Sequence, residues 1–317
     1  MAKSQIPTEE DVLNYASTIT NWGRWGDEDE LGTVNHIGPE QIKYASTLVR
    51  EGITISCSRP ISMESAPDSI ASPVIHYMTG SGESSLDNTA QQLVPQQSSG
   101  DFIGMSFHGH SITHIDSLSH MFWNGKMHNN RPSSLVTTRE GATKESIEVL
   151  KNGVVSRGVL IDAARSRGVD WMNPAEAIMP DELDQIAKEQ NVKFRDGDIL
   201  LVRTGNYKRR TEEGPRSPAD GYPGLQAACI PWIHKKSIAV LGGDTVSDVF
   251  PSGYSNIRLP IHQIALPHLG LWLIDNCNLE DLASTCARIN RWEFLFTIAP
   301  LRIRSGTGSP VNPIAIL

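Results

Sequence analysis

The sequence has no long apolar run and no excess of positive charge. No stretch of about 18 apolar residues occurs, so we expect no membrane-spanning helix. The formal net charge of the 317 residues is −8, which gives the chain no general attraction for nucleic-acid phosphates or anionic membranes. We therefore expect neither nucleic acid nor a membrane among its partners.

The cysteine spacing and the composition of the first residues lead us to expect neither a disulfide framework nor a secretory signal. The first residues, MAKSQIPTEEDVLNYAS, lack the apolar segment of a secretory signal. The four cysteines form no CxxC pair and lie in apolar stretches, which fits buried free thiols in a reducing compartment. We expect a cytoplasmic protein. These cysteines are Cys57, Cys229, Cys277 and Cys286.

Several common catalytic motifs are absent. The sequence contains no GxSxG elbow, no HExxH pair and no Walker A loop. The segment SIAVLGGD reads as a strand followed by a glycine turn, but it lacks the GxGxxG order of a dinucleotide site. Asp244 at its end is therefore interpreted as a structural or pocket-lining residue.

Helix and strand signals alternate, which favours one α/β domain over residues 1–317. Four apolar runs, RGVLID, DILLVRTG, SIAVLGGD and LWLID, are typical of buried strands, and each ends in Gly, Asp or Thr. GMSFHG (residues 104–109) predicts a short strand, and WEFLFTIAPLRI (292–303) predicts the last one. Residues 1–50 are expected to form a helical extension packed on the domain.

Two long polar stretches interrupt this pattern, at residues 79–100 and 205–224. Loops of such length in a compact domain are usually functional lids or disordered insertions. The sequence leaves both alternatives open.

Five of the ten histidines lie between His108 and His128. The core of this segment is His110-x-x-x-His114-x-Asp116-x-x-x-His120, and imidazole and carboxylate are standard ligands of zinc, manganese or iron. A fully extended chain would separate His110 from His114 by roughly 13 Å, so the segment must turn if both bind one ion. His114 and Asp116 share a face even in an extended strand. This spacing favours a metal site, whereas His108 and His128 are interpreted as structural or pocket-lining.

The segment HSITHIDSLSH resembles the signature His-x-Gly-Thr-His-x-Asp-x-Pro-x-His. That signature belongs to the cyclase family of metal-dependent hydrolases, which includes bacterial kynurenine formamidase and isatin hydrolase. The three histidines, Thr113 and Asp116 match, while Ile112 replaces the glycine and Leu118 the proline. These departures concern loop shape rather than ligand chemistry. The tail PLRIRSGTGSPVNPIAIL and the N-terminal NWGRWGDEDELGTVNHIGPE are also similar to a longer branch of the family.

The resemblance implies a swivelling β/β/α fold with a mixed sheet and flanking helices. It also implies a homodimer or homotetramer and a divalent ion, Mn²⁺ or Zn²⁺. His110, His114 and Asp116 would bind that ion, and His120 matches the family's proton-transfer histidine. Further residues are expected near the ion or in the pocket on the same analogy. Near the ion these are His262, Gln263 and Asp275, and in the pocket Trp25 and Asn35.

Other pocket residues are suggested by their own chemistry. Phe122 and Trp123, next to the histidine segment, would form an apolar wall on which a flat substrate could stack. Arg203, at the end of a predicted strand, could hold a substrate carboxylate through its bidentate fork, or form an ion pair within the protein.

The predicted function is hydrolysis of an amide, lactam or lactone carbonyl by metal-activated water, with a small cyclic or aromatic substrate. One alternative is a metal-dependent cyclase or dehydratase acting on a small carbonyl compound. Another is a relative that binds metal or ligand without catalysis, and a third is a structural protein whose histidines only pack.

Overall fold

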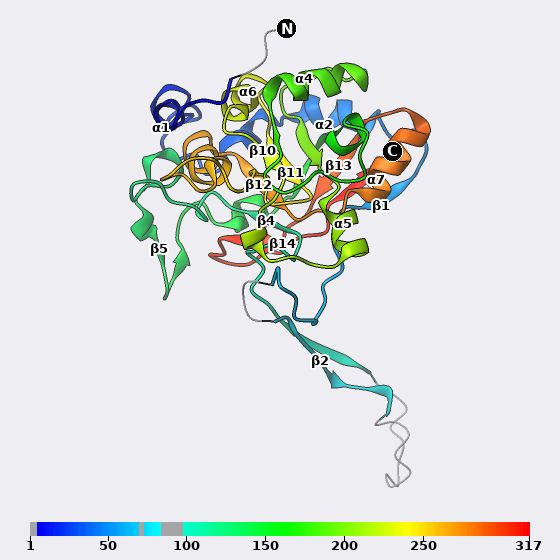
Figure 1. Ribbon diagram of the computed structural model, residues 1–317. Coiled ribbons are helices and arrows are strands. Elements are labelled where there is room, and N and C mark those ends of the chain that lie inside the picture. Colours follow the sequence, from blue (N-terminus) through cyan, green and yellow to red (C-terminus); the bar gives the residue numbers. More distant parts are fainter. Residues whose placement is uncertain (1–4, 70–72, 84–97) are drawn as a thin grey trace, which may run out of the picture.

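The centre of the protein is a nine-stranded mixed sheet, seen in the computed structural model, which describes residues 5–69, 73–83 and 98–317 (Figure 1). In spatial order the sheet contains β1 (Thr54–Ser56), β15 (Ile314–Ile316), β13 (Glu293–Ile298), β7 (Val154–Asp162), β9 (Ile199–Arg203), β11 (Val240–Gly243), β12 (Trp272–Asp275), β4 (His114–Asp116) and β14 (Gly308–Pro310). Three small pairs lie outside it, namely β2 (Ile75–Gly80) with β3 (Gly100–Gly104), β5 (Val136–Thr137) with β6 (Gly141–Ala142), and β8 (Ala177–Ile178) with β10 (Gly224–Leu225).

Helices surround this sheet. The α-helices are α1 (Glu9–Thr18), α2 (Pro39–Ser46), α3 (Ala163–Ser166), α4 (Pro180–Glu189), α5 (Asn206–Glu213), α6 (Cys229–Lys235) and α7 (Glu280–Ile289). The 3₁₀ turns are η1 (Gly32–His36), η3 (His128–Asn130), η4 (Ser133–Leu135), η5 (Ile147–Leu150) and η6 (Pro218–Asp220), and η7 (Ile261–Leu269) is a π-helix. The helix α2 packs against β7 and β13, and α4 packs against β7. The predicted α/β fold with a mixed sheet and flanking helices is confirmed.

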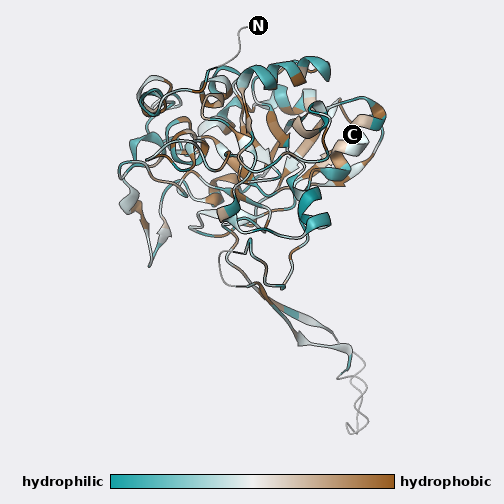
Figure 2. Ribbon diagram, viewed as in Figure 1, coloured by the Kyte–Doolittle hydropathy of each residue, from teal (hydrophilic) through white to brown (hydrophobic). Residues whose placement is uncertain are grey.

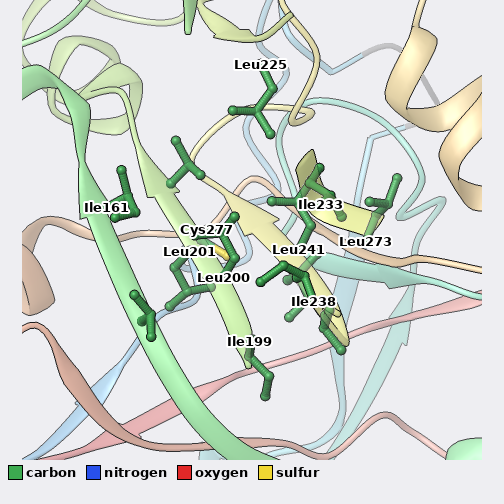
Figure 3. Packing of buried hydrophobic residues seen from close by; sticks show 14 of the residues in the cluster. Ile161, Ile199, Leu200, Leu201, Leu225, Ile233, Ile238, Leu241, Leu273 and Cys277 are labelled. Carbon is green, nitrogen blue, oxygen red and sulfur yellow. The ribbon is translucent and has the colours of Figure 1, made fainter. Parts of the chain in front are cut away.

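The four predicted buried strands form the middle of the sheet. The strands β7, β9, β11 and β12 pair in parallel, and nearly all their residues are buried. Strands covered on both faces are expected to be continuously apolar, as these are. Figure 3 shows Leu200, Leu201, Leu241 and Leu273 packed together in this region. In Figure 2 the inner strands are hydrophobic (brown), whereas much of the outer helices is hydrophilic (teal).

Parallel strands bring their polar ends to one edge of the sheet. At this edge Arg203 pairs with Asp162 across β9 and β7, at 2.8 Å between nitrogen and oxygen. Asp244, just beyond β11, accepts hydrogen bonds from the main chain and hydroxyl of Thr204, at 2.9 and 2.8 Å. Asp275 ends β12. Because ligands of α/β sheets bind at the carboxyl ends of strands, this edge is the natural position for a site.

Three local predictions were wrong. A strand was predicted at residues 104–109, but the observed strand β3 covers Gly100–Gly104 and ends where the predicted one begins. The stretch 205–224 is not a loop throughout, because α5 fills Asn206–Glu213 and its first amide donates to Asp244. The strand β13 is not the last, because β14 and β15 follow it and return the chain to the sheet. Of the stretch 79–100, residues 84–97 lie outside the described residues.

The N-terminal segment between α1 and η1 is docked on the end of η7. The indole of Trp22 stacks on the ring of His268, at 4.8 Å between centroids, and its nitrogen donates to the carbonyl of Pro267. Asn21 donates through its main chain and side chain to the carbonyls of His268 and Leu269, both at 2.9 Å. These bonds satisfy carbonyls at the helix end that would otherwise lack donors.

His128 is fully buried beneath this segment, and it makes stability depend on pH. Burial lowers the pKa of His128 to about 4, although the carbonyl of Pro267 and the carboxylate of Asp29 both act to raise it. Because the unfolded-state pKa is near 6.5, the stabilising contribution of the neutral ring is present above pH 6.5 and is lost as the pH falls toward 4. The full loss is on the order of 3 kcal/mol.

The variant His128→Gln removes this titration. Between pH 7 and about 4.5, its unfolding free energy should fall less than that of the unmodified protein by about 2–3 kcal/mol. Urea unfolding at the two pH values measures the difference, and the other titrating groups cancel because both proteins contain them. Equal pH dependence in the two proteins would contradict the assignment.

In the described parts of the chain, every helix is too short or too polar to cross a membrane.

Candidate metal centre

The strand β4 carries the centre of the site between β12 and β14. His114 and Asp116 are two residues apart and therefore point to the same face of the sheet. The antiparallel register places Asp275 of β12 directly opposite His114. Residues paired in this way lie close enough for their side chains to meet. As a result, one imidazole and two carboxylates meet, with ligand atoms all within 4.8 Å of one another.

A second group shares Asp116 with the first. His108, Asp116 and His120 also bring one ligand atom each within 4.8 Å of one another. The Nδ1 atom of His108 lies 2.9 Å from Oδ1 of Asp116, and Nε2 of His120 lies 3.9 Å from Oδ2. The two rings stack face to face, at 3.9 Å between centroids and with 4° between their planes. Gly308 makes room for this arrangement, because a Cβ there would lie 2.8 Å from the His108 ring.

His262 approaches the same carboxylates from η7. Its Nε2 atom lies 3.2 Å from Oδ2 of Asp275 and 3.6 Å from Oδ2 of Asp116. Its Nδ1 atom donates to Oδ2 of Asp248 at 2.7 Å. The same buried carboxylate accepts from the amide of Ile261, also at 2.7 Å. Asp248 therefore fixes both the beginning of η7 and the orientation of the His262 ring.

The donor set fits a divalent cation. Both carboxylate oxygens of Asp116 and Oδ1 of Asp275 are buried and accept no hydrogen bond within the described chain. A buried carboxylate without donors is costly unless a positive charge compensates it. His114 donates through Nδ1 to the carbonyl of Ile112 at 2.9 Å, which leaves the lone pair of Nε2, 3.4 Å from Oδ1 of Asp116, available to a cation. Imidazole nitrogens and carboxylate oxygens that converge in this way are the usual ligands of Zn²⁺ and Mn²⁺.

The electrostatics of the group are dominated by burial and by Asp116. Burial raises the pKa of Asp116, but His120, His108 and His114 outweigh it and hold that pKa well below its ordinary value. Burial lowers the pKa of His120 to about 4, although Asp116 opposes the shift. The pKa of His262 is lowered by burial, but Asp275, Asp116 and Asp248 more than compensate and raise it well above the ordinary value.

His110 lies beside these groups rather than within them. Its ring stacks on Tyr222, at 4.9 Å between centroids, and its Nδ1 atom is buried without a hydrogen-bond partner among the described residues. Burial lowers its pKa to about 4, and the carboxylate of Asp275 is the main opposing influence. Its role as a ligand stays a prediction.

The remaining predicted site residues have other contacts. Gln263 accepts from the amide of Leu259 through Oε1, at 2.8 Å. Asn35 donates to Asp29 and Gly32, and the edge of Trp25 meets the ring of His36. Phe122 is exposed, and Trp123 is partly buried against the core. Arg203 forms ion pairs with Asp162 and Glu280. Of its two predicted roles, these contacts match the ion pair within the protein rather than the binding of a substrate carboxylate.

Sequence reasoning missed two residues and one contact at this site. His108, interpreted as structural or pocket-lining, does line the adjoining cavity, but its contact with Asp116, eight positions away, was not foreseen because it depends on the turn between them. Asp248 is too far from the motif for any spacing argument. Arg59 was not considered, although its two terminal nitrogens donate to the carbonyls of His110 and Asp244, at 2.9 and 2.6 Å. It thereby ties the histidine loop to the edge of the sheet.

A small cavity of about 60 Å³ adjoins the cluster. It combines imidazole, aromatic and guanidinium surfaces with an aliphatic wall. Its lining includes Arg59, Phe107, His108, His110, Ile112 and Tyr207.

The dependence of the site on Asp248 is testable. Asp248→Asn keeps an oxygen that can accept from the amide of Ile261, but it removes the charge that holds the His262 ring. Changing a partner that orients a ligand typically costs about 10–100-fold in metal affinity, and we expect a loss of that size. Calorimetric titration of the metal-free protein with Zn²⁺ and with Mn²⁺ measures it. Unchanged affinity for both ions would contradict the role of Asp248 in orienting a ligand, and with it the assignment of His262 as that ligand.

Comparison with known proteins agrees with the fold and the motif. The Cyclase family model, described as "Putative cyclase", matches residues 55–248. A crystal structure described as a novel cyclase has 30% sequence identity and a TM-score of 0.85, and the match covers 95% of this chain and 99% of that one. The chain therefore belongs to the cyclase family, as its histidine motif suggested. A search of curated proteins gave no match.

More distant structures share the fold. Isatin hydrolase A from Labrenzia aggregata, bound to benzyl benzoate, has 19% identity and a TM-score of 0.59, with 86% of this chain and 94% of that one covered. A predicted metal-dependent hydrolase from Bacillus stearothermophilus has 16% identity and a TM-score of 0.51, with 83% and 97% covered.

Proposed function

We propose that the protein is a metal-dependent hydrolase that cleaves an amide, lactam or lactone carbonyl of a small substrate. The observation that carries this proposal is the Asp116 carboxylate. It is 1% exposed, no hydrogen bond from the described residues reaches it, and the imidazoles of His108, His114 and His262 surround it. A cation held among these groups would supply the positive charge that the buried carboxylates call for.

The proposed ligands are His114, Asp116 and Asp275, together with His262 and the predicted ligand His110. A divalent ion bound there lowers the pKa of water and polarises a carbonyl group. Mn²⁺ and Zn²⁺ both suit nitrogen and oxygen ligands of this kind. Because Asp116 belongs to two groups of potential ligands, the centre offers positions for one or two ions.

His120 is proposed as the residue that moves the proton. Four histidines have a nitrogen within 4.0 Å of the Asp116 carboxylate, and that of His120 is the farthest of them; the stacked ring of His108 fixes the plane of His120. Burial keeps the ring neutral near pH 7, so it can accept a proton from the attacking water. It then donates that proton to the leaving nitrogen or oxygen of the substrate.

The cavity supports a small, flat substrate. Phe107 and Tyr207 offer aromatic surfaces, and Ile112 adds an aliphatic wall. Three solved structures with the same fold are described as isatin hydrolases, which supports a cyclic or aromatic compound. We propose the cytoplasm as the location, since all four cysteines are free and buried.

The test combines metal analysis with a substrate screen. Elemental mass spectrometry of the purified protein should find about one or two divalent ions per chain and identify the element. The metal-loaded protein is then incubated with panels of formamides, lactams and lactones, and the metal-free protein serves as the control. No bound metal after reconstitution with Zn²⁺ and Mn²⁺ would overturn the proposal.

A second candidate is a metal-dependent cyclase or dehydratase. The family description and the crystal structure of a novel cyclase favour it. In that reaction the polarised carbonyl is attacked within the substrate, so no water is added overall. Product mass separates the candidates, because hydrolysis adds one water and dehydration removes one.

A further inference from the structure

Arg59 is a buried arginine without a carboxylate partner among the described residues. It is 4% exposed, and no ion pair joins its guanidinium to a carboxylate of the described chain. Its Nε atom is buried and has no hydrogen-bond acceptor within that part of the chain. A buried cation is costly unless an anion compensates it.

The other buried arginines of the described chain have partners inside the protein. Arg131, Arg157 and Arg203 each form an ion pair with one or two carboxylates. Arg209 forms none, but its Nε donates to a neighbouring amide oxygen at 3.4 Å. Among these buried arginines of the described chain, Arg59 alone keeps a donor nitrogen without an acceptor.

The nearest acids have other partners and do not neutralise Arg59. The carboxylate of Asp244 accepts three hydrogen bonds from the segment that follows β9. The carboxylate of Asp68 is paired with Arg210, at 3.1 Å between Oδ1 and Nη2. Burial and the charge of Arg210 lower the pKa of Arg59 to about 10, so Arg59 remains a cation near pH 7.

The guanidinium of Arg59 is fixed in position. Its main-chain amide donates to the hydroxyl of Thr113 at 2.8 Å, and its two terminal nitrogens donate to the carbonyls of His110 and Asp244. The ring of Tyr207 lies 5.1 Å from its Cζ atom. These contacts leave Nε and one hydrogen on each terminal nitrogen unused. Nε and one terminal nitrogen are the two donors that a side-on, bidentate pair with a carboxylate needs.

The unused donors belong to a residue that lines the cavity beside the metal centre. His108 and His110 line the same cavity of about 60 Å³. Since one water needs about 10–15 Å³ of such space, a carboxylate group fits, and the rest of a larger molecule must extend outward. The cavity lining has two further charged side chains, Arg210, which is paired with Asp68, and Glu64, which is exposed.

We propose that Arg59 binds a carboxylate group of the substrate, whose carbonyl to be cleaved then reaches the adjoining metal centre. The substrate class is therefore an acid that carries its carboxylate apart from the reacting carbonyl. This rests on the proposed function for the reacting carbonyl, whereas the carboxylate site itself does not depend on turnover. A neutral amide of the same shape leaves the guanidinium unpaired and is therefore bound less tightly.

The test compares the binding of benzoate and benzamide, which share a ring and differ in the charge of the group that Arg59 would bind. Calorimetric titration of the Zn²⁺-loaded full chain should show benzoate binding about 10–100-fold more tightly than benzamide. The metal-free protein should keep this preference, because the guanidinium rather than the ion provides the positive charge. This comparison needs no substitution.

Variants assign the preference to Arg59. Arg59→Gln should bring the two affinities to the same value, and Arg59→Lys should keep part of the difference, because it retains the charge but not the planar fork. The control is Arg216→Gln, which removes an exposed arginine paired with Glu213 and should leave the preference intact. A purely structural role of Arg59 would weaken both ligands equally, so the ratio of the affinities isolates the charged contact.

Three results would overturn the proposal. These are equal affinities in the unmodified protein, a preference for benzoate that survives Arg59→Gln, and a preference that disappears when the metal is removed. The binding measurements do not require turnover. A preference that depends on Arg59, in a protein that hydrolyses no formamide, lactam or lactone, would therefore overturn the proposed function and leave the carboxylate site in place.

Discussion

Asp116→Asn should abolish metal binding and, with it, any metal-dependent turnover. Asp116 is the one residue common to both groups of potential ligands, and the asparagine retains the shape of the carboxylate but not its charge. We expect affinity for Zn²⁺ and Mn²⁺ to fall by more than about 100-fold, beyond the usual cost of altering a partner that orients a ligand. Calorimetric titration of the metal-free variant measures this loss.

A matched change at a surface carboxylate provides the control. Asp170, which is paired with Lys208, is exposed, and Asp170→Asn should leave metal affinity unaltered. Metal should also raise the Tm of the unmodified protein and of the control but leave that of Asp116→Asn unchanged, because only a folded site binds the ion. Retention of stoichiometric metal in Asp116→Asn would mean that the centre lies elsewhere.

His120→Ala should reduce turnover by about 10²–10⁴-fold while metal content stays the same, as expected for a group that only transfers protons. The substitution removes a ring that stacks on His108, and so it leaves a space of imidazole size. Added imidazole should therefore restore part of the activity in a concentration-dependent way. Elemental analysis accompanies the kinetics, since a fall in metal content would assign His120 to the ligands instead.

Comparison of the Asp116→Asn and His120→Ala variants distinguishes a residue that binds the cation from one that transfers a proton. Asp116→Asn should lose both metal and turnover, whereas His120→Ala should lose only turnover. Equal loss of metal in both would indicate that the group formed by His108, Asp116 and His120 is the site of the ion.

The sheet could be predicted from the sequence because its central strands are buried on both faces. Ile199–Arg203 and Trp272–Asp275 consist almost wholly of apolar residues up to their polar ends. Shorter strands lack that signal. The strand β14, Gly308–Pro310, contains no large apolar residue, and only its pairing with β4 makes it a strand.

The site could be predicted only where its residues are close in sequence. His114 and Asp116 share a face of any strand, so their proximity follows from alternation. The contacts of His108 with Asp116 and of Asp248 with His262 depend on how separate elements pack, and no local spacing reports that. Arg203 illustrates the opposite difficulty. From the sequence, an arginine at a strand end could bind a ligand or form an ion pair equally well, and only its contacts with Asp162 and Glu280 decide between the two.

The helix η7 has His262 near its first residue, while its last carbonyls receive the N-terminal segment. Because both would restrain η7, we expect occupancy of the metal centre and docking of that segment to be thermodynamically linked. A cation that restrains His262 should slow hydrogen exchange at the amide of Asn21, and a truncation that frees the carbonyls of His268 and Leu269 should weaken the cation in equal measure. If so, the N-terminal segment would contribute to metal affinity although it lies far from the ligands in the sequence.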